Sequence, residues 1–92
     1  MNPLRFQNVA MALGELIETE GFKALWDSPD AKSQEFRQGV EWVQMRCLAL
    51  KPDAPTDREI EDRLLTLEGL CVAGLARFRR FILMAREALH AA

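Results

Sequence analysis

The fold is decided by residues 57–88, which read DREIEDRLLTLEGLCVAGLARFRRFILMAREA. Apolar or small residues recur in this stretch at alternating steps of four and three, at positions 60, 64, 67, 71, 74, 78, 81, 85 and 88. That spacing defines one face of an α-helix, and the stretch contains no proline. We therefore predict one uninterrupted helix over residues 57–88, roughly 48 Å long at 1.5 Å per residue.

A second helix is predicted over residues 29–50, where positions 36, 40, 43, 47 and 50 repeat the same spacing. Ser28 is the expected N-cap and Pro29 the first helical residue. The proline-containing segment 51–55 ends this helix, and Thr56 with Glu59 forms a capping box that opens the next one. Such a short connection forces an antiparallel hairpin. Aligning its two apolar seams gives three expected pairs: Val43 with Leu64, Val40 with Leu67, and Phe36 with Cys71.

A first helix is predicted over residues 3–20, with Asn2 as its cap, Pro3 at its first position and Gly21 as a left-handed C-cap. Residues 21–28 form a hydrophobic elbow in which Trp26 is expected to be a core anchor. The predicted fold class is all-α, a single domain over residues 1–92. Its architecture is an antiparallel helical hairpin plus an N-terminal helix, which makes a three-helix bundle with a long C-terminal helix.

Several kinds of chemistry lack the residues they need. The chain has one histidine and no tyrosine, and its glycines form no phosphate-binding loop. Cys47 and Cys71 both fall on apolar seams, so we expect free, unreactive thiols kept apart by the hairpin register. Glu87 and His90 have the spacing of a di-metal helix motif, but the other helices supply no matching glutamates. We therefore predict no catalytic residue, no cofactor and no metal site, and a protein that is not an enzyme.

The net charge of −2 is unevenly distributed along the chain. Residues 1–68 carry 8 basic and 13 acidic side chains, whereas residues 69–92 carry 4 basic and 1 acidic. The acidic balance argues against nucleic acid as the main partner. The longest apolar run, residues 69–76, is far shorter than the roughly 20 residues of a membrane span. Without a secretory pattern, the expected location is the cytoplasm, meaning the host cytoplasm or a virion if a phage encodes the chain.

The predicted C-terminal helix is apolar on more than one face. Leu65, Val72, Leu75 and Ile82 form a second stripe, offset from the seam. Either the N-terminal helix covers this stripe as ordinary core, or another chain covers it. A chain of 92 residues has a thin stability margin, which favours an interface with a second copy or another protein.

Two further features are candidates for that interface. Trp42 lies off the seam of its helix, so it is either packed under a neighbouring element or an interface hot spot. Arg77, Arg79 and Arg80 form a basic cluster beside two phenylalanines. We expect these arginines to form ion pairs, either with glutamates 15, 18 and 20 of the first helix or with a partner; phosphate contacts are the alternative.

Two stretches resemble small helical proteins encoded among the virion genes of tailed bacteriophages. They are GFKALW at 21–26 and LEGL-x-x-x-GL-x-x-F at 67–78. The resemblance implies a structural or accessory role in assembly. Our prediction is a non-enzymatic protein–protein assembly or adaptor module that forms a homo-oligomer or part of a larger assembly. The alternatives are a small inhibitor that binds an enzyme or nucleic-acid complex and, third, direct nucleic-acid binding by the arginine cluster.

Overall fold

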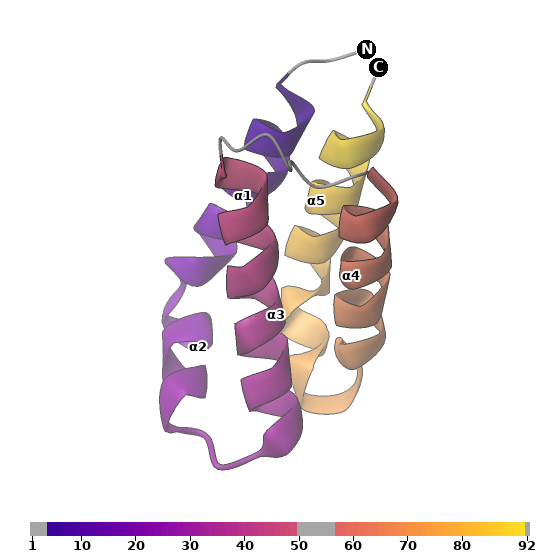
Figure 1. The fold of residues 1–92 in the computed structure, drawn as a ribbon. Helices are drawn as coiled ribbons and strands as arrows, with labels where there is room; N and C mark the ends of the chain where they lie inside the picture. The colour runs from indigo at the N-terminus through magenta and orange to yellow at the C-terminus, as the bar shows by residue number, and fades with distance from the viewer. Residues whose placement is uncertain (1–3, 50–56, 92) are drawn as a thin grey trace.

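Four long helices lie side by side in a computed structural model of the chain, which describes residues 4–49 and 57–91 (Figure 1). The longer helices are α1 (Arg5–Ile17), α3 (Ala31–Leu48), α4 (Asp57–Leu70) and α5 (Arg79–His90). The short elements are α2 (Glu20–Lys23) and the 3₁₀ helices η1 (Ala24–Asp27) and η2 (Ala73–Phe78). No strand occurs in either described range, and the predicted all-α class is confirmed.

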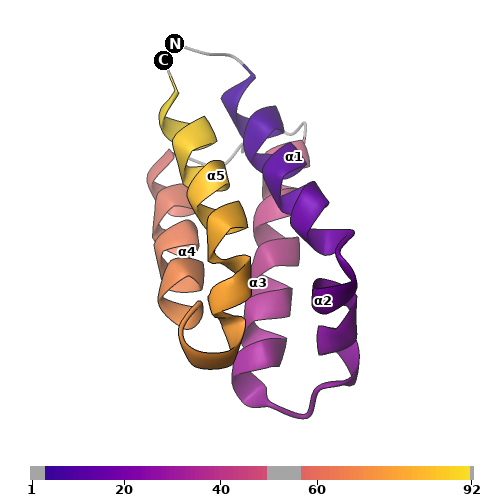
Figure 2. The same cartoon turned by 180° about the vertical axis from the view of Figure 1, so that it is seen from behind.

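The helices form a ring in which each long helix packs against two others. α1 packs on α3 and α5, and α4 packs on the same two helices from the other side. The start of α1 and the end of α5 lie at one end of the bundle, while the elbow and the turn from α4 to α5 lie at the opposite end (Figures 1 and 2). Consecutive long helices therefore run in opposite directions around one shared core.

The prediction of one helix over residues 57–88 is wrong. α4 ends at Leu70, and the chain turns at Cys71 and Val72. The backbone N–H of Cys71 donates to the carbonyl of Glu68 at 3.0 Å, and Val72 is extended, with φ −114° and ψ 164°. α5 then returns antiparallel to α4, so the longest dimension of the protein is 39 Å. A continuous helix over this stretch would alone be roughly 48 Å long.

Burial explains why the chain folds back. Leu75 and Ile82, which the strict four–three seam leaves out, retain only 5% and 0% of their exposure. The buried positions after Cys71 are 75, 78, 81, 82, 85 and 89, while Gly74 is exposed. The strict four–three seam selects Gly74, which has no side chain to bury, and passes over the adjacent leucine.

Three contacts join α3 to α4. Arg46 and Glu59 form an ion pair at 3.5 Å, and the Arg63 guanidinium lies 4.4 Å from the centre of the Trp42 ring. Gly39 lies directly against Leu67, since a Cβ at Gly39 would be 2.6 Å from Cδ2 of that leucine. These contacts agree with the predicted pairs to within two residues.

Three expectations about the elbow are wrong. α1 ends at Ile17, and the Thr19 hydroxyl accepts the N–H of Phe22 to start α2, so Gly21 lies inside a helix and is not a left-handed cap. α3 is capped by Asp30, whose carboxylate accepts the N–H of Ser33 at 3.3 Å, and not by Ser28. Trp26 is 59% exposed and is not a core anchor. The caps predicted at Asn2, Pro3 and Thr56 and the connection at 51–55 lie outside the described residues.

An aromatic cluster fixes the elbow end of the bundle. The rings of Phe36 and Phe78 stack with centroids 5.4 Å apart, and Phe22 packs at 6.3 Å from each. Gly21 permits this arrangement, because a Cβ there would lie 3.3 Å from the Phe78 ring. Three rings from α2, α3 and η2 thus join elements that are far apart in the sequence.

The contact at Gly39 gives a prediction about stability. Replacing Gly39 with alanine adds a methyl group against buried Leu67, and we expect the free energy of unfolding to fall by about 1 kcal/mol after helix propensity offsets part of the overpacking. Gly69→Ala is the matched control, because nothing lies within 4 Å of its added Cβ. That control should gain up to about 1 kcal/mol. Urea denaturation of both variants measures the difference, and equal effects would contradict the packing at Gly39.

Candidate protein interface

An uncharged groove runs between α1 and α3. It is lined by Gln7, Ala10, Met11 and Gly14 of α1 and by Gln44 and Leu48 of α3, and it has a volume of about 430 Å³. Met11 and Leu48 are 68% and 55% exposed. Exposed Met45 lies one turn before Leu48, and Leu4 lies two turns before Met11. We call these eight residues the α1/α3 face. An apolar face without charges, bordered by polar side chains, is typical of a protein contact surface.

The floor of the groove is formed by a close approach of the two helices. The Gln44 amide points across to the carbonyl of Ala10 at 3.5 Å, and a Cβ on Gly14 would lie 3.2 Å from its Nε2 atom. Gly14 therefore allows the close contact between the two helices. Sequence reasoning missed the groove because Met11 and Leu48 each lie off the seam of their own helix.

The predicted second stripe divides into two parts. Leu75 and Ile82 are sealed in the core of the single chain, so the prediction that they form an interface is wrong for the folded monomer. Leu65 and Val72 remain 44% and 58% exposed. Because α5 turns back and packs against α1, Leu75 and Ile82 enter the core, whereas Leu65 and Val72 do not.

Trp42 and Trp26 differ in their exposure and in the arginine that lies over each ring. Trp42 is half-buried against the core, with the Arg63 guanidinium over its ring, so its surroundings fit packing better than an open hot spot. Trp26 is exposed at the elbow, and the guanidinium of buried Arg37 lies 3.8 Å from the centre of its ring. Arg37 is held in turn by hydrogen bonds to Gln34 and Glu41.

Of the three clustered arginines, Arg79 forms an ion pair within the chain, and its acidic partner lies on α4 and not on the first helix. Arg79 pairs with Glu68 at 3.1 Å, and Arg86 bridges Glu68 at 2.7 Å and Glu61 at 3.1 Å. Nε2 of His90 lies 2.5 Å from Oε2 of Glu61. We call this row of five side chains the α4/α5 ladder.

The other two arginines of the cluster have different surroundings. Arg77 donates to the carbonyl of Gly74 and lies over the Phe78 ring, and Arg80 lies over the Phe81 ring at 4.6 Å. Both are exposed beside the small pocket between the elbow and η2. Two arginines remain directed to the surface there, whereas Arg79 and Arg86 are engaged by glutamates.

The ladder makes stability depend on pH. Partial burial raises the pKa of Glu61, but hydrogen bonds and charges from His90 and Arg86 outweigh it and lower the pKa below its ordinary value of 4.5. The stabilisation is therefore present above pH 4.5 and is lost as the pH falls through the native pKa. We expect Glu61→Gln to lower the free energy of unfolding at pH 7 by up to about 1 kcal/mol.

Thermal unfolding at pH 7 and pH 3 tests this expectation, and the difference between variant and wild type should shrink at the lower pH. Glu87→Gln is the control, because exposed Glu87 forms no ion pair with any described residue. An equal loss in both variants would contradict the role of the ladder.

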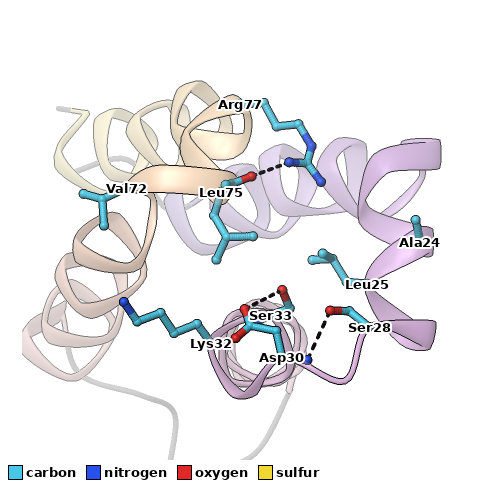
Figure 3. Close-up of a pocket in the computed structure, with 10 residues that line it drawn as sticks. Ala24, Leu25, Ser28, Asp30, Lys32, Ser33, Val72, Leu75 and Arg77 are labelled. Atoms are coloured by element: carbon cyan, nitrogen blue, oxygen red, sulfur yellow. Dashed lines mark hydrogen bonds between the residues drawn. The ribbon is translucent and has the colours of Figure 1, made fainter.

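A second pocket, of about 280 Å³, lies at the elbow end, between the start of α3 and η2. Figure 3 shows Lys32 and Arg77 approaching it from different elements, with Ser28, Asp30 and Ser33 on one wall and Leu25 and Leu75 beside them. The Ser33 hydroxyl donates to Asp30, and the Asp30 backbone N–H donates to Ser28 (Figure 3). These polar groups are thus satisfied by capping α3, which gives them a structural role.

Both thiols are free and buried, in agreement with their positions on the seams. Burial raises the pKa of Cys47 and of Cys71 from an ordinary value of 9.0 to about 11. At pH 8 the native thiolate fraction is therefore about 100-fold below that of the unfolded chain.

We accordingly expect slow labelling of both thiols by a disulfide reagent at pH 8 and rapid labelling in denaturant. Because the unfolded state loses these protons first, the contribution of the two thiols to stability should be constant below pH 9 and fall between pH 9 and 11. Absorbance assays of labelling and urea titrations across this pH range measure both effects. Equally rapid labelling of native and denatured protein would contradict the burial.

The fold and its surfaces define a small α-helical bundle whose exposed features are apolar faces and ion pairs. Within residues 4–49 and 57–91, no three histidine, cysteine, aspartate or glutamate side chains gather as a metal site requires. No helix in these ranges is long and apolar enough to cross a membrane. Comparisons with protein-family models, with curated proteins and with solved structures found no match.

Proposed function

We propose that this chain is a non-enzymatic assembly or adaptor module of the cytoplasm that acts by binding other protein chains. The observation that carries the proposal is the uncharged α1/α3 face, on which Met11 and Met45 are 68% and 71% exposed. Methionine is flexible and adapts its shape to an apolar partner. The resemblance of residues 21–26 and 67–78 to phage virion proteins also favours a role in assembly.

A second copy of the same chain is the partner that this face fits best. The chain is acidic overall, so most pairs of like surfaces repel, but the groove-lining residues carry no charge and can meet themselves in a two-fold dimer. In such a dimer the exposed methionine of one copy faces the groove of the other. A small chain also gains stability from association, because its own core buries a limited share of its surface.

Light scattering and sedimentation equilibrium test the proposal on protein that has been kept folded. We expect a rapidly reversible dimer, and we expect the double variant Met11→Lys, Leu48→Lys to weaken its association at least tenfold, or about 1.4 kcal/mol, by placing charges in the apolar contact. A 10.5 kDa species at every concentration up to about 1 mM would contradict self-association through this face.

Leu65→Lys provides the matched control. Leu65 is also an exposed leucine, at 44%, but it lies on α4, outside the groove. Association should be unchanged in this variant. If Leu65→Lys prevents association and the double variant does not, the contact surface is the exposed part of the second stripe, and the assignment to the α1/α3 face is wrong.

A further inference from the structure

We propose that two copies of this chain exchange their C-terminal arms. In the exchanged dimer, residues 57–90 form one long helix, and α5 of each chain takes its place in the bundle of the other. The place that α5 leaves in its own bundle is therefore filled by the α5 helix of the second copy. This exchange uses the core surface of α5 and not the α1/α3 face, so it goes beyond the contact proposed above.

The first argument is the helical phase of the two halves of the arm. The buried residues of α4, η2, α5 and the turn between them are Ile60, Leu64, Leu67, Cys71, Leu75, Phe78, Phe81, Ile82, Ala85 and Leu89. On one straight helix at about 100° per residue, all ten fall within an arc of about 120°. From Ile60 to Leu89 the helix makes eight turns plus about 20°. The two halves therefore share a single apolar side even if the turn between them is removed.

That shared side is what a two-fold exchange requires. When two bundles meet end to end at their elbow ends, a straight arm passes from one core to the other, and both halves must present their apolar residues in the same direction. Two antiparallel helices of one hairpin do not need such a phase, because the turn can set the rotation of each. The agreement is thus an independent property of the arm.

The second argument is that the exchange preserves the interactions of α5. In the monomer, α5 packs on α1 through its buried residues and on α4 through the ladder. In the exchanged dimer the same contacts form with the other copy, so Arg86 of one chain pairs with Glu61 of the other. Only the turn at Cys71 and Val72 and the short 3₁₀ helix η2 change their conformation, which makes exchange a low-cost route to a dimer.

The third argument is that the turn lacks residues that specify a bend. Glycines 69 and 74 do not adopt a left-handed conformation, and the space around each is open within 4 Å. Val72 is extended and 58% exposed. No proline occurs between residues 57 and 90. The local sequence therefore permits a continuous helix, and the bend is maintained by the packing of α5.

The decisive experiment mixes two charge variants. Within one chain, Glu61→Lys places a lysine beside Arg86. Arg86→Glu places a glutamate beside Glu61 and Glu68. An exchanged heterodimer instead pairs the new lysine with the new glutamate in one bundle and restores the original pair in the other. After unfolding and joint refolding at about 1 mM, native mass spectrometry should show a dimer, at twice the 10.5 kDa chain mass, that is predominantly mixed. A statistical mixture of dimers, or monomers alone, would overturn the exchange.

Hinge variants provide a second test that does not depend on the ladder. Ala73 is the first residue of η2 and follows extended Val72, so Ala73→Pro fits the bent form and disrupts a continuous helix. This variant should form no exchanged dimer after refolding at about 1 mM, so that combined with Met11→Lys and Leu48→Lys it should be monomeric. The double variant Val72→Ala, Gly74→Ala favours the helix in both chains and should raise the association constant about tenfold or more. Equal dimer fractions in both variants would refute the proposal.

The two kinds of dimer are distinguishable in the same assay. A dimer that survives the double variant Met11→Lys, Leu48→Lys and is abolished by Ala73→Pro is the exchanged dimer. A dimer that is abolished by the double variant and survives Ala73→Pro is formed by the α1/α3 face. Failure of one proposal therefore leaves the other standing.

Discussion

The packing of α5 against α1 is the constraint on which the rest of the structure depends. Sequence neighbours form the other helix pairs of the ring, α1 with α3, α3 with α4, and α4 with α5, whereas this contact joins the two ends of the chain. It buries Ile82 and Ala85 completely and makes a hairpin with an added helix into a closed four-helix ring. Without it, the apolar side of the last twelve helical residues would face water, at a cost of about 1.5–3 kcal/mol for each large side chain.

This constraint also decides how far the sequence predicts the structure. Periodicity locates the first two long helices to within a few residues, and the register at Gly39 and Leu67 follows from aligned seams. It does not locate the turn at Val72, because all the residues around it are compatible with a helix. A local pattern reports which side of a helix is apolar. It does not report whether that side is covered by a neighbour along the chain, by a distant segment or by another molecule.

The errors at the candidate site follow from the same cause. With α5 folded back, Leu75 and Ile82 become core, and the arginines reach glutamates of α4 that a continuous helix would keep far away. The α1/α3 face was not predicted for a different reason. Met11 and Leu48 are isolated apolar positions in their own helices, and such residues are normal on any surface. Only the antiparallel packing of α1 on α3 brings them into one groove, so no single-helix pattern contains the signal.

The distribution of charge separates the two halves of the bundle. Between α4 and α5 the contact is bordered by the ladder, in which opposite charges specify the antiparallel register and also allow the same pairing with an identical chain. Between α1 and α3 the polar groups that line the groove are the neutral amides of Gln7 and Gln44, which specify no sign of charge in a partner. The two dimers that we propose rest on these properties: ion pairs that an identical chain could also supply, and a groove whose lining carries no charge. The small size of the chain would make the proposed association energetically useful, because each additional contact would add buried area that a 92-residue core cannot supply alone.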